Sequence, residues 1–449
     1  MAEKENLYNK MLRLVLPISF QQLMLALVGA SDAIMLGKLD QNAMSAVSLA
    51  SQVTFVFNLF MTAFVVGENM FAAQYYGKKD YAGISATFVL VLRISCLMAI
   101  PFLTGSLFFP DRIMCFLTNE PDLIRMGNEY LRYIGISYLF SAIAQVCLTI
   151  LKNCGAVNQS SVISSLTVMF NIVLNAVFIF GLWGFPAMGI RGAALATVTA
   201  TALQMILGVV YVKREMRQIK VHLLEKDREL AKQFRLKVAP VMFNELIWGC
   251  GFTLYSIIMG HLGTDAVAAN SIANISKNLM ICFCLGLGSG GSILIGNELG
   301  ADHFEEAKRI GRILTWASVI GGVLSGLFLL ALSPAIISLV DLTPEAKNIL
   351  GRMLVICSYY IAGKSINCMT IGGIFPAGGD SKFGLVCDTV TLWCITIPLG
   401  CLCAFVYRLP VLVVYFVLNL DEVIKLPAVY RHYKKYGWVK NITNQSITS

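Results

Sequence analysis

The chain has 449 residues, of which 57% are hydrophobic and 14% are charged, and its net charge is +9. Soluble proteins carry about 25% charged residues, so this composition excludes a soluble enzyme, a secreted module and a disordered chain. A basic balance is typical of a membrane protein whose Lys and Arg residues gather in cytoplasmic loops, and it does not indicate nucleic-acid binding.

Apolar stretches recur along the whole chain, and about 20 mostly apolar residues are enough to span a membrane as a helix. Twelve windows meet this length, and Gly and Pro residues mark the junctions between them. In chain order the predicted spans are 12–36, 47–72, 87–108, 131–151, 161–182, 192–212, 238–260, 267–295, 313–332, 350–374, 385–406 and 410–426.

The distribution of Lys and Arg predicts how these spans are oriented. With the N-terminus in the cytoplasm, 24 of the 35 basic residues fall on the cytoplasmic side, 8 on the other side and 3 within spans. This asymmetry predicts that both termini are cytoplasmic. We expect a monomer in a bacterial plasma (inner) membrane, with the lipid bilayer and small organic substrates as its partners and no nucleic acid.

The Cys and His residues do not form a pattern typical of a cofactor site. The 13 Cys residues are scattered through apolar stretches, and the four His residues lie in predicted loops or tails. We therefore expect no cofactor, disulfide framework or His-built metal site. A membrane enzyme would need a cluster of His or acidic residues, and a channel would need a re-entrant Gly-rich filter, so neither class is predicted.

The two halves of the chain share spaced features that indicate an internal repeat. Pro17 and Pro240 open corresponding spans, and Gly37 and Gly260 end them, each pair 223 residues apart. The alternative is that helical membrane proteins generally place Pro and Gly near helix ends. Since each half has an even number of spans, the halves begin on the same side, and the repeat is parallel, about an axis along the membrane normal.

The predicted fold is therefore an all-α integral membrane protein, with twelve transmembrane helices in two six-helix lobes related by a parallel pseudo-two-fold repeat. We expect an N-lobe at 1–212, a basic cytoplasmic linker at 213–237, a C-lobe at 238–427 and a cytoplasmic tail at 428–449. Pro17 and Pro240 are the expected hinges. Two lobes that rock about a central cavity would give the alternating access of a transporter.

Several motifs, in order along the whole chain, resemble those of the multidrug and toxic compound extrusion (MATE) family. The resemblance implies a two-lobe, twelve-helix antiporter that exports organic compounds against an inward flow of Na⁺ or H⁺, and it leaves the choice of ion open. The matching segments are 31–39 (SDAIMLGKL), 73–80 (AQYYGKKD), 171–175 (NIVLN), 189–197 (GIRGAALAT), 262–269 (LGTDAVAA) and 377–380 (AGGD).

Ionisable residues inside spans are costly and usually functional. We expect Asp421 and Glu422, at the inner end of the last span, to reach the membrane interface, and we leave them aside. Asp388 is expected to be structural. Seven ionisable residues lie well inside predicted spans: Asp32, Glu68, Arg93, Glu245, Lys277, Lys364 and Asp388.

The N-lobe candidates for binding the coupling cation centre on Asp32, which matches the aspartate of the family's N-lobe. Asn171 and Asn175 share one helix face, and their amide oxygens would suit Na⁺ beside a carboxylate; the alternative role is hydrogen bonding between helices. Thr197 is a weaker candidate ligand. Glu68 either acts as a second acid or pairs with Arg93.

In the C-lobe, Glu245 matches an intramembrane glutamate of the Na⁺-coupled branch, and it opens an aromatic helix face that would suit amphipathic cations. Where some relatives have an aspartate, the tenth span offers Lys364, which could pair with Glu245 or Asp388 or receive an anionic substrate. A lipid-linked precursor flippase is the alternative transporter. The expected cavity residues are Gln21, Trp248, Tyr255, Asn270, Asn274, Lys277, Lys364 and Asn367.

Overall fold

The computed structural model describes residues 2–215, 227–340 and 342–444. Much of the predicted basic linker, residues 216–226, and the last five residues of the predicted tail lie outside the described residues. Throughout the described ranges the chain folds into helices, with no β-strand, as the predicted all-α class requires.

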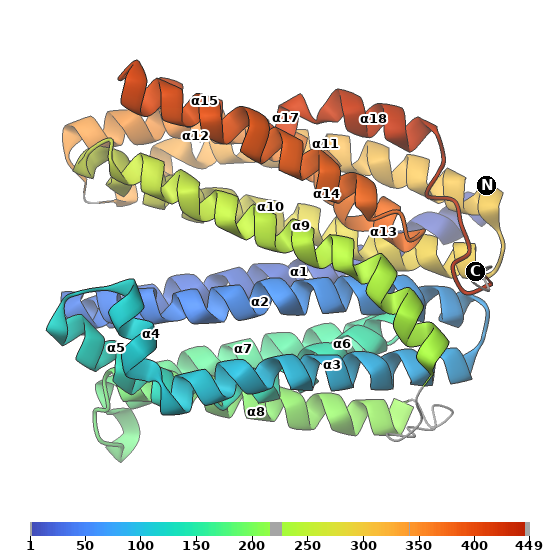
Figure 1. The fold of residues 1–449 in the computed structure, drawn as a ribbon, viewed down its shortest axis with the longest axis horizontal. Coiled ribbons are helices and arrows are strands. Elements are labelled where there is room, and N and C mark those ends of the chain that lie inside the picture. The colour runs from blue at the N-terminus through green and yellow to red at the C-terminus, as the bar shows by residue number, and fades with distance from the viewer. Residues whose placement is uncertain (1, 216–226, 341, 445–449) are drawn as a thin grey trace. The chain divides into compact units, whose positions relative to one another are not determined.

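The helices follow the predicted spans closely at most positions (Figure 1). Ten of the described helices are individually long and apolar enough to cross a membrane. In chain order the helices of the first half are α1 (Ala2–Leu39), α2 (Gln41–Gly77), α3 (Tyr81–Phe108), α4 (Pro110–Leu117), α5 (Pro121–Ile134), α6 (Ser137–Asn153), α7 (Val157–Phe180) and α8 (Ile190–Glu215).

The second half has long helices followed by shorter pieces, and three of its segments, η2 to η4, are π-helical. Its elements are α9 (Arg228–Gly260), α10 (Thr264–Gly300), α11 (Phe304–Leu339), α12 (Pro344–Met369), η2 (Thr370–Ile374), α13 (Phe375–Ala377), α14 (Lys382–Thr389), η3 (Val390–Thr396), α15 (Ile397–Cys401), η4 (Leu402–Val406), α16 (Val411–Leu418), α17 (Asp421–Ile424) and α18 (Leu426–Lys434).

Two of the predicted spans are interrupted. The window 131–151 corresponds to the end of α5 and to α6, which are bent by 47° and together make an eleventh candidate span. The window 410–426 is divided into α16 and α17 by a turn at Asn419 and Leu420. In both places the apolar pattern continues across the break, so composition alone did not reveal it.

The chain forms two compact units, which we call unit 1 (Met1–Leu23 with Arg235–Ser449) and unit 2 (Met24–Phe234). The second boundary lies inside the expected linker at 213–237. The first boundary divides α1, whose beginning packs with the C-terminal half of the chain. The assignment of residues to two moving lobes stays a prediction.

Unit 2 is a bundle in which α2, α3, α6, α7 and α8 pack along one another (Figure 1). A cluster of aromatic side chains fixes α2, α3 and α6, because the rings of Phe57, Phe102 and Tyr138 lie with centroids 5.0 to 5.9 Å apart. Asp40 and Asp80 cap the starts of α2 and α3 by accepting hydrogen bonds from the backbone amides of Ala43 and Gly83.

Unit 1 is built around α10, which is rich in glycine where other helices approach it. A Cβ at Gly286 would lie 2.6 Å from the backbone N and Cα of Ser19 in α1. On another side, a Cβ at Gly288 would lie 2.7 Å from the carbonyl oxygen of Cys368 in α12. Small residues let helix backbones approach closely within a membrane, and this close packing holds the beginning of α1 in unit 1.

We predict that Gly286→Ala lowers the free energy of unfolding by about 1–3 kcal/mol, because the added methyl group overlaps the backbone of Ser19 and forces α1 and α10 apart. The thermal unfolding midpoint of the detergent-solubilised protein measures this. Gly29→Ala is the control, since a Cβ there meets nothing within 4 Å. Equal midpoints for the two variants would show that the close contact is not required.

Candidate functional site

In unit 2 the structure brings together three of the predicted cation ligands, Asp32, Asn171 and Asn175, which we call the Asp32 cluster. The amide nitrogen of Asn175 donates to Asp32 Oδ1 at 2.6 Å and is 3.2 Å from Asn171 Oδ1. Asn171 and Asn175 are buried, and Asp32 is half-buried. The predicted shared face of the two asparagines therefore points toward Asp32, from α7 to α1.

The Asp32 cluster is chemically suited to a small cation or a proton. The side-chain oxygen of Asn175 is buried and has no hydrogen-bond partner among the described residues. A carboxylate and amide oxygens are the ligands that hard cations prefer, and a carboxylate can also take up a proton. Tyr130 of α5 lies close enough to interact electrostatically with Asp32, so a third helix contributes to the surroundings.

Thr197 and Gln21 are not part of the contacts within the Asp32 cluster. The Thr197 hydroxyl donates to the carbonyl of Ala193, one turn earlier in α8, at 3.1 Å. Gln21 shares a face of α1 with Asp32 in sequence terms but belongs to unit 1, where its side-chain oxygen is buried without a partner among the described residues. Their predicted roles stay predictions.

Glu68 lies deep inside unit 2 and is not paired with Arg93 by a hydrogen bond. Glu68 is 0% exposed, and neither carboxylate oxygen has a hydrogen-bond partner in the described part of the chain. Lys152 of α6 interacts with it electrostatically.

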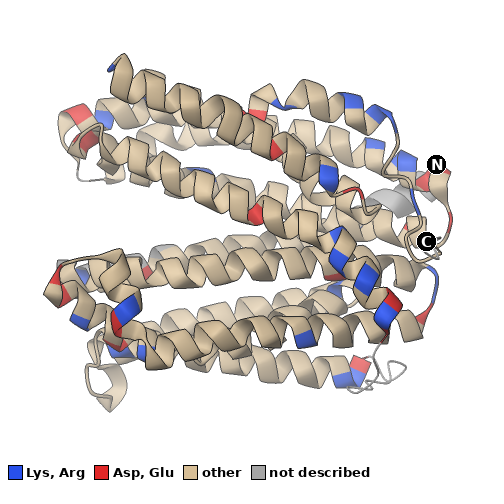
Figure 2. Cartoon of the chain, in the orientation of Figure 1, with Lys and Arg blue, Asp and Glu red and all other residues tan. Residues whose placement is uncertain are grey.

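Charged residues lie mainly near helix ends, and only a few occur along the helices (Figure 2). In unit 1 the charges inside the bundle join into a network of ion pairs, which we call the Glu422 network. Glu422 contacts Lys364 at 3.0 Å and Lys425 at 3.1 Å, and Lys425 contacts Asp388 at 2.7 Å. The network links α12, α14 and α17 inside the apolar bundle.

Amide side chains complete the Glu422 network. Asn367 donates to Glu422 Oε2 at 2.7 Å and to the Glu422 backbone carbonyl at 2.8 Å. Asn244 of α9 donates to Asp388 Oδ2 at 3.0 Å. Glu422, Asp388 and Lys425 therefore each have more than one polar partner, which buried ion pairs need if attraction is to offset the cost of leaving water.

The Glu422 network corrects three sequence-based expectations. Lys364 pairs with Glu422 and not with Glu245 or Asp388. Asp421 and Glu422 do not reach a membrane interface, because they are only 3% and 0% exposed. Lys425, counted as a loop residue, is buried as well. The turn at Asn419 and Leu420 is the reason, since it places the short helix α17 against α12, where a Cβ at Gly363 would lie 3.1 Å from the Glu422 carbonyl.

Glu245 lies beside the Glu422 network, where Lys364 and Asp388 interact with it electrostatically. Two aromatic residues that follow it on α9 contact each other: the rings of Trp248 and Phe252 stack with centroids 5.7 Å apart. Lys364 lies over the Trp248 ring, 5.4 Å from its centroid. An acid, a lysine and stacked aromatic rings are thus neighbours in one part of unit 1.

Further along α9, Tyr255 is tied to the eleventh span. Its hydroxyl lies 2.7 Å from that of Thr396 in η3. Met259, four residues further along α9, is buried in the core around Ala269 and Leu354. Pro17 and Pro240 both lie within continuous helices, α1 and α9, where each removes one backbone hydrogen bond; their hinge role stays a prediction.

The polar residues of α10 do not all occupy one environment. Asn274 donates to Asn270 at 3.2 Å. Lys277 is buried, with its ammonium group 3.5 Å from Asn419 Oδ1 and 4.6 Å from the centroid of the Tyr360 ring. Asn278, the next residue, is exposed. Lys277 therefore points into unit 1.

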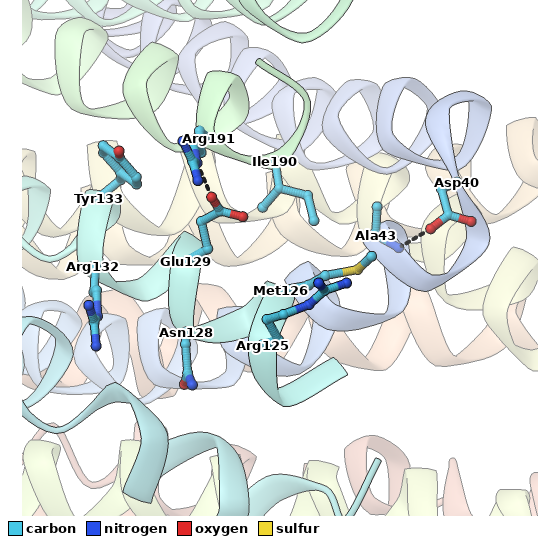
Figure 3. Close-up of a pocket in the computed structure, with 10 residues that line it drawn as sticks. All are labelled: Asp40, Ala43, Arg125, Met126, Asn128, Glu129, Arg132, Tyr133, Ile190 and Arg191. Atoms are coloured by element: carbon cyan, nitrogen blue, oxygen red, sulfur yellow. Dashed lines mark hydrogen bonds and ion pairs between the residues drawn. The ribbon is translucent and has the colours of Figure 1, made fainter. Parts of the chain in front are cut away.

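Sequence reasoning did not identify a polar surface pocket of about 720 Å³ in unit 2 (Figure 3). The pocket lies between the start of α2, the helix α5 and the start of α8, and the Glu129 carboxylate pairs with Arg191 across it. Its Arg residues had been counted only as loop charges. Its lining residues are Asp40, Ala43, Arg125, Met126, Asn128, Glu129, Arg132, Tyr133, Ile190 and Arg191.

A protein-family model matches most of this chain. The MatE family model matches this chain twice, at residues 17–177 and 240–402. The two matches begin at Pro17 and Pro240, so they confirm the repeat and its offset of 223 residues.

Two bacterial relatives match along most of the chain. The "Uncharacterized transporter YisQ" of Bacillus subtilis (strain 168) is 23% identical over 94% of this chain and 93% of its own length. The "Probable multidrug resistance protein NorM" of Rhizobium meliloti (strain 1021) is 25% identical over 90% of this chain and 87% of its own length.

Solved structures share the fold at lower sequence identity. A mutant of the Vibrio cholerae MATE transporter VcmN superposes with a TM-score of 0.89 and 17% identity, over 97% of this chain and 98% of that one. A MATE protein in complex with MaL6 superposes with a TM-score of 0.87 and 17% identity, over 95% of each chain. These matches confirm the predicted twelve-helix fold.

Proposed function

Because the chain belongs to the MatE family, whose members are membrane transporters and not enzymes, we propose that it is a cation-coupled antiporter that exports amphipathic organic cations by alternating access. The observation that carries the coupling is the Asp32 cluster, a carboxylate and two amide side chains gathered within the bundle of unit 2. Buried acids inside membrane helices usually serve ion or proton pathways.

Coupling needs a group whose charge differs between the loaded and empty states. When Na⁺ or H⁺ occupies the Asp32 cluster, the carboxylate is neutralised; when the cluster is empty, its charge remains buried among helices. A state that exposes Asp32 to water would then be favoured when it is empty, and a closed state when it is loaded. The amide of Asn175, 2.6 Å from Asp32 Oδ1, keeps the carboxylate oriented in either case.

The proposed substrate region is the neighbourhood of Glu245. An acidic group beside the stacked rings of Trp248 and Phe252 offers both charge and an aromatic surface to an amphipathic cation. Lys364, over the Trp248 ring, occupies the position that a bound cation would take. We propose that Lys364 and the substrate cation compete for this surface.

The test is efflux from inverted membrane vesicles with Na⁺ and H⁺ gradients imposed separately, using a fluorescent organic cation as substrate. We predict that Asp32→Asn abolishes gradient-driven transport, because an amide can neither bind a proton at neutral pH nor supply a charge to Na⁺. Asp40→Asn is the matched control: Asp40 is exposed and only caps α2. Undiminished coupled transport in Asp32→Asn would refute the proposal.

The same vesicles separate the alternatives. Lys277 and Lys364 inside unit 1 favour export of an anionic metabolite or flipping of a lipid-linked precursor as the second candidate. Transport of an anionic dye in place of the cation, lost in Lys364→Met, would support that candidate. We further propose that the protein acts as a monomer in a bacterial inner membrane with both termini in the cytoplasm, as the distribution of basic residues predicts.

A further inference from the structure

Glu68 is a buried acid to which the proposed mechanism assigns no role. It lies nine residues before the end of α2, in the half of the helix that ends at Gly77. The Asp32 cluster lies toward the opposite end of unit 2, since α1 and α2 are joined at Asp40. At about 1.5 Å of rise per residue, the two acids are roughly 30 Å apart along the bundle.

The surroundings of Glu68 contain amide groups that are only partly satisfied. Asn153 of α6 donates to Asn69 Oδ1 at 2.7 Å and to the backbone carbonyl of Thr149 at 2.9 Å. The side-chain oxygen of Asn153 is buried and has no partner within the described ranges, and the same holds for both oxygens of Glu68. This part of the bundle therefore has three acceptor oxygens and no donor assigned to them.

Other titratable groups occur on the helices that pack against α2. Arg93 and Cys96 lie on α3, and Cys147, Lys152 and Cys154 lie on α6 or directly after it. Glu68 interacts electrostatically with Lys152, Cys147 and Cys154. Lys152 is half-buried near the end of α6, and no ion pair within 4.0 Å joins it to Glu68 among the described contacts.

Protonation of the Glu68 carboxyl group would remove its buried charge. An ionised carboxylate at 0% exposure with neither oxygen hydrogen-bonded is strongly disfavoured in a membrane bundle. A protonated carboxyl group is neutral, so its burial without a partner costs far less free energy than burial of the ion. We propose that Glu68 is a second proton-binding site of unit 2, held as a neutral carboxylic acid inside the bundle.

Infrared spectroscopy of the purified full-length protein tests this without reference to transport, so its outcome is separate from that of the proposed antiport activity. At neutral pH we expect Glu68→Gln to remove a carbonyl band of a protonated carboxyl group. Glu120→Gln is the control, because Glu120 is exposed at the start of α5 and its removal leaves that band unchanged. A spectrum with no band lost in Glu68→Gln would overturn the proposal.

Thermal unfolding and a second variant test the proposal independently of that spectrum. Glutamine has nearly the shape of a neutral glutamic acid, so we expect the unfolding midpoint of Glu68→Gln to equal or exceed that of the wild type. In Lys152→Met the carbonyl band should persist unchanged. A new band that appears only in Lys152→Met would mean that Glu68 is ionised in the wild type, and would refute a resident proton.

Discussion

Glu422→Gln is expected to lower the free energy of unfolding by about 3–5 kcal/mol, the effect typical of removing one partner from a buried ion pair. Glu422 is the acid shared by Lys364 and Lys425, at 3.0 and 3.1 Å. Without its charge, Lys364 loses its carboxylate partner and Lys425 keeps only Asp388. The loss should appear as a lower thermal unfolding midpoint and a lower yield of monodisperse protein.

Two further variants test whether the effect comes from the buried ion pairs: a control at an exposed acid, and a compensating change at Lys364. Glu305→Gln removes the partner of Lys308, but Glu305 is 87% exposed, and exposed pairs contribute about 0–1 kcal/mol. Adding Lys364→Met to Glu422→Gln removes the unpaired charge, and should recover part of the lost stability. A Glu422→Gln variant as stable as Glu305→Gln would contradict a structural role for the network.

The members of the Asp32 cluster were predicted separately. Asp32 was singled out because it is an acid inside the first span that matches the family's aspartate, and the asparagines were singled out by their spacing. Asn171 and Asn175 are four residues apart on one helix, so they must share a face. The repeat was predictable for a similar reason, since Pro17 and Pro240 could be compared directly. In both cases, the spacing of residues along the chain is enough to predict which residues share a helix face or which spans correspond.

The Glu422 network was not predictable in the same way. Lys364 and Glu422 are 58 residues apart, and several acids within or near the spans were available to Lys364. Lys364 pairs with Glu422 for two reasons. The chain turns at Asn419 and Leu420, and the lack of a side chain at Gly363 lets the backbone of α17 pack closely against α12. Neither feature has a signature in an apolar pattern, because a break of two residues does not interrupt the hydrophobic run.

The structure also separates two kinds of buried charge that look alike in sequence. Lys364, Lys425, Asp388 and Glu422 satisfy one another through ion pairs, so their charges are neutralised within the bundle. Asp32 and Glu68 are not joined to Lys or Arg by a described ion pair. Acids of the second kind can bind and release a cation or a proton at the lowest cost to the fold. The proposed coupling site at Asp32 and the proposed proton-binding site at Glu68 are placed on them for that reason.

Trp438→Ala is expected to lower the free energy of unfolding by about 3–5 kcal/mol, the usual cost of removing a fully buried aromatic side chain. The sequence placed Trp438 in a cytoplasmic tail, yet it is 0% exposed and packs in the core of unit 1 with Leu299, Ile310 and Phe375. Its ring stacks on that of Tyr433 with centroids 5.9 Å apart.

Polar contacts before and after Trp438 fix the chain on unit 1. His432 of α18 pairs with Asp380 at 2.8 Å, and its ring stacks on Phe383 at 3.9 Å. After Trp438, the amide of Asn441 donates to Asp302 Oδ1 at 2.7 Å, in the turn between α10 and α11. The segment from α18 to Asn441 therefore connects the ends of several helices, and loss of the Trp438 ring should loosen them together.

Trp316→Ala is the matched control for Trp438→Ala, since it deletes the same side chain from α11 at a position that is 64% exposed. Heating the detergent-solubilised variants and measuring the fraction that remains monodisperse should show a markedly lower midpoint for Trp438→Ala than for Trp316→Ala. Trp438→Phe should fall between Trp438→Ala and the wild type, because it keeps most of the ring contacts but loses the indole hydrogen bond to the Tyr433 carbonyl. If Trp438→Ala were as stable as Trp316→Ala, the tail would be an appendage of unit 1 and not part of its core.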